Sequence, residues 1–238
     1  MRINKFLASC GLGSRRNVEQ LVLDGRVKVN NKQITTLATE IDEKNDKVSL
    51  DGKKVASIAK HLYLAMHKPK GCITTMSDEK GRKTVLDYVP AKYKEKRIFP
   101  VGRLDFETEG LLLLTTDGET ANRILHPRHE LSKTYHVRIG GEVAESDLEK
   151  LRKGVEIDGV KTKPCKVRRL DEIIENETRI EVVIAEGRNR QVRRMFEAVG
   201  KVIAFLKRTA IGDIKLGGMA RGEVRELKPK EIEFLKRF

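Results

Sequence analysis

Segment 101–118, VGRLDFETEGLLLLTTDG, holds the residue types and spacing that most directly suggest chemistry. Arg103 and Asp105 stand two residues apart, so on extended backbone they share a face, and in a loop both can point into a cleft. Glu107 and Glu109 follow, and a pair of carboxylates is what acid–base cleavage of a glycosidic bond uses. An ordinary charged loop ahead of a core strand is the alternative, and composition alone favours it.

Segment 186–195, EGRNRQVRRM, is a second candidate because it concentrates arginine near a helix start. Apolar spacing of i, i+3, i+4 and i+7 predicts a helix over 188–199 that begins after Gly187 and buries Val192, Met195, Phe196 and Val199. The arginines flank this face, with Arg188 in the first turn, followed by Arg190, Arg193 and Arg194. Cations at a helix N-terminus oppose the macrodipole, so a bound phosphate or carboxylate would offset their cost. A solvated helix face is the alternative.

Tyr135 is the third candidate, in the segment Lys133-Thr134-Tyr135-His136-Val137. The segment reads as a strand in which basic residues alternate with others, and a ring presented there could stack on a nucleic-acid base. A tyrosine in a strand is more often a half-buried core residue, and the spacing alone favours that interpretation.

The charge balance points to a polyanionic partner. The chain has 238 residues, a net charge of +14 and a pI of about 9.7, which favours nucleic acid as a partner. The excess is concentrated in two stretches: residues 1–32 hold seven Lys/Arg and two acids, and residues 186–208 hold the same numbers. Hydrophobic residues make up 39% of the chain and Trp is absent, so we expect a sizeable core of Val, Ile, Leu and Ala.

The first 60 residues are expected to form a small unit of their own. Apolar spacing predicts a helix near residues 3–7 and a second helix that Ser14 caps and Asp24-Gly25 ends. RVKVNNKQI predicts two strands joined at Asn30-Asn31, and KVSLDGKKV predicts a further strand and a turn at Asp51-Gly52. Because the basic excess lies on the helix–turn–strand part, we expect nucleic-acid contacts from Arg15, Arg16, Arg26 and Lys28.

From residue 62 the pattern changes to strands, which are predicted at YLAMHKP, CITTM, RIFPVG, LLLLTT, KTYHVRI, CKVRRL, RIEVVIAEG and VIAFLKR. Helices are predicted at 119–125, 145–153 and 188–199, and Pro229 can start a last helix. The fold class is therefore α+β: a small α/β unit at 1–60 precedes a domain at 61–238 built on a large mixed, mainly antiparallel sheet with flanking helices. Residues 57–62 are the linker candidate.

Three cysteines at positions 10, 72 and 165 fit neither a disulfide framework nor a metal site, and the five histidines have no ligand spacing with them. We therefore expect no metal and reduced thiols. The N-terminal apolar patch is too short for a signal segment, and no run of 18 apolar residues exists to span a membrane. The expected location is cytoplasmic, and a monomer is expected.

Together, four elements resemble the small ribosomal-RNA pseudouridine synthases, namely Lys68-Pro69-Lys70-Gly71, GRLDFETEGLLLLTTDG, KTYHV and EGRNRQVRRMFEAVG. The resemblance covers residues 62–238. Residues 1–60 resemble the S4 RNA-binding domain through KFLASCGLGSRR and LVLDGRVKVNNK. The segment TTDGETANRILHP favours the large-subunit branch of the family, as does Arg190, at a position where the small-subunit branch more often has His.

This resemblance implies a mechanism without cofactor or metal, in which uracil is detached from its ribose at N1, rotated and rejoined through C5. It implies that Asp105 is the nucleophile, towards either the sugar anomeric carbon or C6 of the base. Arg193 matches the residue that pairs with this aspartate, and a nearby cation favours an ionised carboxylate. Tyr135 matches the tyrosine that stacks on uracil, and Arg103 the residue that fills the gap left by the flipped base.

The partner that the resemblance implies is ribosomal RNA, with large-subunit 23S rRNA favoured over small-subunit 16S rRNA. Phosphate contacts are expected from the basic stretch and the S4-like unit. Leu206 and Arg208 match the last family motif as pocket wall and backbone contact, so the expected RNA-binding set is Arg103, Arg188, Arg190, Arg194, Arg208, Arg15, Arg16, Arg26 and Lys28.

Two other functions fit parts of the sequence. A non-catalytic RNA-binding or ribosome-assembly protein would explain the charge and the S4-like unit, but would not need Asp105, Tyr135 and Arg193 together. An RNA glycosidase would use Asp105 with Glu107 or Glu109 as its second carboxylate. RNA mass separates the enzymes, because isomerisation leaves it unchanged and a glycosidase releases uracil.

Overall fold

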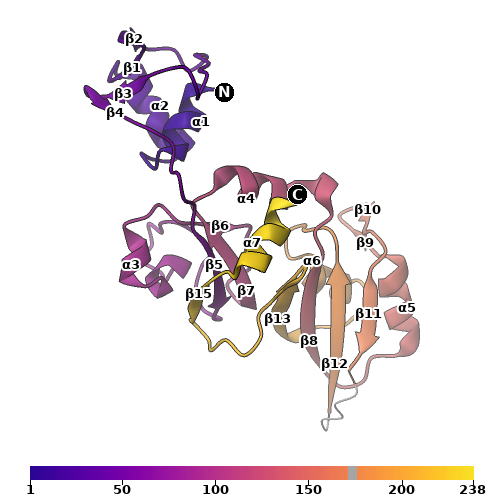
Figure 1. Cartoon of the computed structure of the whole chain (residues 1–238). Coiled ribbons are helices and arrows are strands. Elements are labelled where there is room, and N and C mark those ends of the chain that lie inside the picture. The colour runs from indigo at the N-terminus through magenta and orange to yellow at the C-terminus, as the bar shows by residue number, and fades with distance from the viewer. Residues whose placement is uncertain (171–175) are drawn as a thin grey trace. The chain divides into compact units, whose positions relative to one another are not determined.

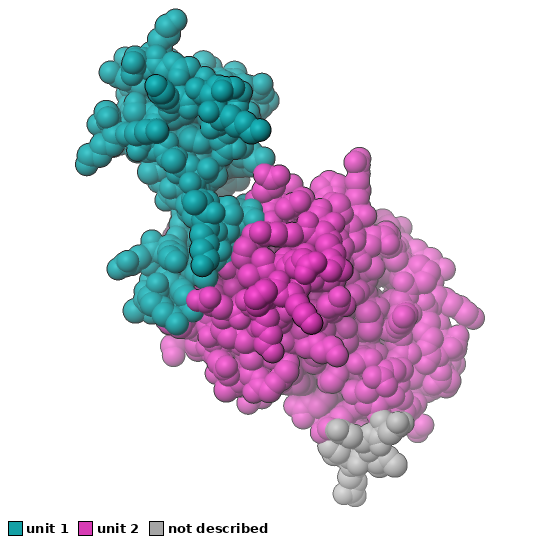
Figure 2. All heavy atoms as spheres, viewed as in Figure 1, with its two compact units in different colours: residues 1–62, 91–98, 115–118 teal, residues 63–90, 99–114, 119–238 magenta. Residues whose placement is uncertain are grey.

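The computed structural model describes residues 1–170 and 176–238. Its described residues divide into two compact units, shown in different colours in Figure 2. The first comprises Met1–Leu62 together with Ala91–Ile98 and Thr115–Gly118, and the second comprises Tyr63–Pro90, Phe99–Leu114 and Glu119–Phe238. The two short segments grouped with the first unit lie within the range that the sequence assigns to the larger domain.

The N-terminal unit contains the predicted helices and hairpins. Helices α1 (Ile3–Ser9) and α2 (Arg15–Leu23) accompany a four-stranded sheet of order β2-β1-β3-β4, from Lys32–Ile34, Val27–Val29, Val48–Leu50 and Lys53–Lys54. The predicted cap of α2 is confirmed, because the hydroxyl oxygen of Ser14 accepts from Asn17 N at 3.0 Å. Asn30 and Asn31 both have positive φ, as a two-residue hairpin turn requires. The core of the unit joins both helices to the sheet through Ile3, Phe6, Leu7, Val18, Val22, Val27, Ile41 and Val48.

The second unit is built on a nine-stranded sheet, counted over the described residues, and confirms the α+β prediction. Its order is β11-β12-β8-β13-β7-β5-β15, from Lys166–Arg169, Glu177–Ile184, Lys133–Gly140, Ile203–Ile211, Glu109–Thr115, Tyr63–Lys68 and Val224–Glu226. Strands β6 (Phe99–Val101) and β14 (Ile214–Lys215) pair with β7 and β13. The pairing of β13 with β7 is parallel, whereas β8 pairs antiparallel with both β12 and β13.

Helices accompany this sheet as Figure 1 shows: α4 (Gly118–Leu125), α5 (Glu145–Lys153), α6 (Gln191–Glu197) and α7 (Pro229–Lys236). Helix α5 contacts β11, and its bounds are the predicted ones. Shorter elements are α3 (Ala91–Lys94), the 3-10 turns Val85–Tyr88 and Pro127–His129, and the ribbon of β9 (Glu156–Ile157) with β10 (Val160–Lys161).

Two predicted elements are wrong. CITTM forms no strand: its Ile73 makes only an isolated bridge, while the Thr74 hydroxyl donates to Leu104 O at 2.8 Å. The predicted helix over 188–199 begins only at Gln191, so Arg188 is not in its first turn. Arg190 has a φ of 49° there, in the left-handed region, which interrupts the helical backbone that the apolar spacing suggested.

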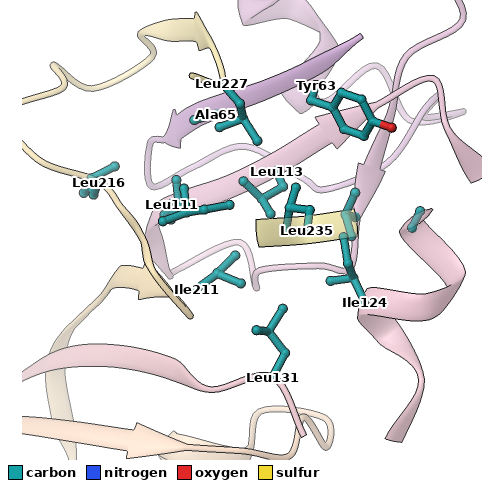
Figure 3. Close-up of a cluster of buried hydrophobic side chains, with 13 residues drawn as sticks. Tyr63, Ala65, Leu111, Leu113, Ile124, Leu131, Ile211, Leu216, Leu227 and Leu235 are labelled. Carbon is teal, nitrogen blue, oxygen red and sulfur yellow. The ribbon is translucent and has the colours of Figure 1, made fainter. Parts of the chain in front are cut away.

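Strand β7 lies in the middle of the sheet and is buried along its whole length, which explains its run of four leucines. Leu111 and Leu113 point into a cluster that also receives Ile124 of α4 and Leu235 of α7, as Figure 3 shows. The loop that precedes β7, which holds Asp105, therefore adjoins a fully buried strand of the sheet.

In the described part of the chain, no helix is long and apolar enough to cross a membrane. The three cysteines are free, and no cluster of three or more His, Cys, Asp or Glu side chains suited to a metal ion occurs among the residues described.

Candidate active site

Asp105 and Tyr135, two of the three predicted catalytic residues, line one cavity of about 70 Å³ in the second unit. Asp105 belongs to the loop between β6 and β7, and Tyr135 to the middle of β8, where it pairs in register with Val182 of β12. The walls also include Arg103, Leu104, Thr108, Ile184, Gly187, Arg188, Arg190, Gln191, Val192 and Leu206. Three segments that are far apart in sequence thus meet here, as the sequence motifs predicted.

The backbone that presents Asp105 is fixed by contacts to its carbonyl groups. Leu104 O accepts from the Thr74 hydroxyl at 2.8 Å, and Phe106 O accepts from Gly71 N at 2.9 Å. Asp105 O accepts from Thr108 N at 3.1 Å, which closes a tight turn around Phe106. The loop is therefore held at successive carbonyls, and the Asp105 carboxylate is positioned by the backbone rather than by its own side-chain contacts.

Lys68 also holds this loop, a role not predicted from the sequence. Its side chain is fully buried at the end of β5, and its ammonium donates to the carbonyl oxygens of Pro69, Asp105 and Thr108 at 3.1, 3.0 and 2.9 Å. Burial lowers the pKa of Lys68, while the charges of Cys72, Asp105 and Glu107 act to raise it. The one sequence signal for Lys68 was its place in the motif Lys68-Pro69-Lys70-Gly71 after an apolar strand.

Arg193 was expected to pair with the Asp105 carboxylate, and that contact is not formed. Its guanidinium donates instead to Glu107 O at 3.2 Å and to Ile203 O at 3.3 Å. Burial and then the charge of Arg190 lower the pKa of Arg193, while the charges of Asp105 and Glu107 act to raise it. Arg193 therefore lies within electrostatic range of Asp105 and adds another hydrogen bond to the loop that carries it.

Several predicted RNA contacts are occupied by partners within the chain. Arg194 forms an ion pair with Asp158, and Arg26 forms one with Asp51 at 2.6 Å. Arg188 donates to the backbone oxygens of Val160 and Lys161, both at 2.9 Å. These three side chains would have to exchange an internal partner for a phosphate.

Arg208 is buried, with 4% of its surface exposed, and its Nε donates to Leu111 O at 2.7 Å. The family resemblance implied that Arg208 contacts the RNA backbone, and its burial argues against a contact made at the outer surface of the unit. Arg15, Arg16, Lys28, Arg103 and Arg190 are exposed, and their side chains have no partner among the described residues.

The two glutamates that follow Asp105 already have cationic partners. Glu109 is buried and accepts from Arg221 Nε at 2.9 Å, with His67 Nε2 at 3.7 Å. Glu107 is half-exposed and pairs with Lys70 at 3.1 Å. Neither residue lines the cavity of Asp105, so the carboxylate pair that a glycosidase would need is not assembled there.

Comparison with known proteins agrees with this geometry. The family described as RNA pseudouridylate synthase matches residues 62–198, and the S4 domain matches residues 1–48. Ribosomal large subunit pseudouridine synthase B of Bacillus subtilis is 42% identical over 99% of this chain and 95% of its own length. The protein of that name from Vibrio cholerae is 40% identical over 99% of this chain and 74% of its own.

A solved structure described as a pseudouridylate synthase superimposes with a TM-score of 0.70 at 31% identity, covering 99% of both chains. The S4 match falls on the helices and strands of the N-terminal unit, and the synthase match contains both Asp105 and Tyr135. The chain therefore belongs to the RNA pseudouridylate synthase family, as an isomerase with an N-terminal S4 domain.

Proposed function

We propose that this enzyme converts a specific uridine of large-subunit 23S rRNA to pseudouridine, with Asp105 as the nucleophile. The observation that carries the proposal is that Asp105 and Tyr135 line one cavity. Asp105 lies on a loop whose carbonyl groups accept hydrogen bonds from Lys68, Thr74 and Arg193. The choice of the large subunit rests on the two relatives named above, which are large-subunit enzymes. The S4 domain and the net charge of +14 support RNA as the substrate.

In the proposed reaction the N1–C1′ bond of uridine breaks and a C5–C1′ bond forms. If Asp105 attacks C1′, the N1–C1′ bond breaks and an Asp105–ribose ester forms; C5 of the uracil held in the cavity then attacks C1′ and the carboxylate leaves. If Asp105 attacks C6, an Asp105–uracil adduct forms, and its C6–O bond breaks after C5 has joined C1′. C5 loses its proton and N1 gains one, so atoms and electrons balance without a cofactor. Rigid positioning of the carboxylate is the main contribution of the protein, because a reaction between held groups avoids the entropy of encounter.

The target uridine is proposed to leave the RNA stack to reach Asp105, because a base inside a duplex is inaccessible to a cavity of this kind. Tyr135, with 8% of its surface exposed, supplies a ring at the cavity wall against which uracil can stack. Arg103 is exposed at the rim and has no internal partner among the described residues, so its guanidinium is free to occupy the vacated position in the RNA.

The neighbouring residues Arg193 and Arg194 form a matched pair for testing the role of Arg193. Arg193→Ala is expected to lower kcat by about tenfold to a hundredfold, because it removes a charge near Asp105 and the hydrogen bond to Glu107 O. Arg194→Ala removes an equal charge that is already paired with Asp158, so kcat should change by less than about threefold. Single-turnover rates and rRNA affinities measured on both variants check this, and equal losses of rate and affinity for Arg193→Ala would make it a phosphate contact instead.

The S4 domain is proposed to hold the rRNA through Arg15, Arg16 and Lys28, which have no internal partner among the described residues. The double variant Arg15→Ala/Arg16→Ala is expected to weaken rRNA binding and reduce the slope of log Kd against log salt by about two. Arg26→Ala, whose side chain is paired with Asp51, should change that slope less. Titrations at several salt concentrations provide the measurement, and an unchanged slope for the double variant would leave these arginines without a phosphate contact.

Pseudouridine mapping of total RNA from cells with and without this protein tests the substrate. The expected result is one position in the 23S rRNA that is modified only when the protein is present. A protein-dependent position in 16S rRNA would move the substrate to the small subunit, and no protein-dependent position would favour a non-catalytic assembly factor. We propose a cytoplasmic location for this activity, because the proposed substrate is ribosomal RNA.

A further inference from the structure

A second, larger cavity adjoins the one that holds Asp105. It has a volume of about 400 Å³, and it shares Arg103, Tyr135, Gly187 and Arg188 with the catalytic cavity. Its apolar wall comes from the same cluster that Figure 3 shows, including Leu113, Ile124, Leu131 and Ile211. The two spaces therefore share a wall that includes Tyr135, and a ligand in the larger one would lie beside a nucleotide bound at Asp105.

The acidic side chains of this larger cavity are already neutralised. Glu130 forms an ion pair with Lys163. Glu186 accepts from Lys163 N at 3.0 Å and from the Gln191 amide, and it lies 3.5 Å from Arg188 Nε. These acids offer little to compensate further positive charge in the cavity.

Two cations on the cavity wall remain without an acidic partner among the described residues. Among the described residues, Lys133 donates to Leu131 O, at 3.0 Å. Its ammonium nitrogen lies close to Gly187 on the shared wall, 3.8 Å from the position that a Cβ on that glycine would take. Arg208 uses Nε for Leu111 O, and its Nη2 is buried without any hydrogen-bond partner. The charge of Arg208 adds to burial in lowering the pKa of Lys133.

Two like charges that share a partly buried space, one with an unused donor, are costly for the fold unless an anion binds between them. We propose that the larger cavity is an anion site, in which Lys133 and Arg208 bind a phosphodiester group of the RNA next to the target uridine. Arg103 at the shared wall lies beside the path between that phosphate and the flipped base. This role for Arg208, inside a cavity, replaces the surface contact that its burial argues against. The inference rests on the proposed function, because it assumes that RNA enters the cavity of Asp105.

The first test measures the salt dependence of binding to a full-length large-subunit rRNA transcript, which requires no catalysis. Lys133→Met should reduce the slope of log Kd against log salt by about one, and Lys133→Arg should restore it. Lys230→Met is the matched control, because it removes an equal charge from an exposed position in α7. Its slope should equal that of the wild type. An unchanged slope for Lys133→Met would overturn the proposal. Because this readout is binding, it stays informative if no pseudouridine is formed.

The second test locates the phosphate. A short rRNA fragment around the mapped uridine is prepared with a single neutral methylphosphonate at each nearby position in turn. At one position, the methylphosphonate should lower the affinity of the wild type by about tenfold relative to the unmodified fragment. It should leave the affinity of Lys133→Met unchanged, because the protein substitution has already removed the same contact. Full additivity at every position would overturn the proposal.

The third test separates an RNA phosphate from free phosphate and checks folding. Lys133→Met should unfold at a temperature equal to or above that of the wild type, because it removes a poorly compensated charge. If millimolar inorganic phosphate alone raises the wild-type Tm through Lys133, while no methylphosphonate position couples to Lys133, the site takes free phosphate and the RNA assignment is wrong. A lower Tm for Lys133→Met would show that Lys133 stabilises the fold and would contradict the charge argument.

Discussion

Asp105→Asn is expected to lower the single-turnover rate of pseudouridine formation by at least about a thousandfold, because an amide cannot replace a nucleophilic carboxylate. Affinity for rRNA should stay within about threefold, since phosphate contacts dominate binding. Misfolding is not expected, because Lys68 and Thr108 bind the carbonyl of Asp105 and leave its side chain uninvolved in holding the loop. Rates are measured by quantifying pseudouridine in an rRNA fragment with enzyme in excess.

Glu107→Gln is the matched control, because it makes the same carboxylate-to-amide change two residues away. Glu107 is half-exposed, pairs with Lys70 and does not line the cavity, so its rate should fall by less than about threefold. If Asp105→Asn still formed pseudouridine at a tenth of the wild-type rate or faster, Asp105 would not be the nucleophile. Equal losses in both variants would point to a two-carboxylate mechanism.

Lys68→Met should lower both stability and catalysis. The substitution keeps the length of the side chain but removes the ammonium donor from Thr108 O and leaves Asp105 O with Thr108 N alone, which costs about 1–3 kcal/mol of unfolding free energy. The loop that presents Asp105 should then shift, and a displacement near 1 Å reduces the rate by about a hundredfold. Denaturant titration and single-turnover kinetics give the two numbers.

Lys70→Met provides the control for Lys68, because it is the other lysine of the same motif and makes the same change. Lys70 is half-exposed and paired with Glu107, so its removal should change stability by less than about 1 kcal/mol and leave the rate near wild type. A Lys68→Met variant with wild-type kinetics would show that the carbonyl contacts do not position Asp105.

Much of the fold follows from local pattern. The helix Glu145–Lys153, the Ser14 cap and the strand β12 all match sequence expectations, because each depends on local apolar pattern or on a single capping residue. The strand predicted at CITTM is absent because the buried Thr74 bonds to Leu104 O in the Asp105 loop, and the buried Cys72 bonds to Pro69 O, rather than pairing with a neighbouring strand. The predicted start of α6 was wrong because apolar spacing gives no indication of the left-handed backbone of Arg190.

Local sequence motifs could indicate only some of the features of the site. Motifs identified Asp105 and Tyr135, and the structure brings them together. They could not show that Arg193 bonds to a carbonyl rather than to the carboxylate, or that Lys68 is buried, since a side chain's partner is set by packing between distant segments. Charge counts likewise could not separate Arg194, which is paired with Asp158, from Arg15, which has no partner among the residues that the structure describes.

The nucleophilic role of Asp105 is tested most directly by incubating the purified enzyme with an unmodified large-subunit rRNA transcript, followed by mass measurement and pseudouridine mapping of the product. One uridine should be converted to pseudouridine with an unchanged RNA mass, and Asp105→Asn should convert none. Loss of the mass of uracil would identify a glycosidase, and an unmodified transcript or conversion by Asp105→Asn would contradict the central claim.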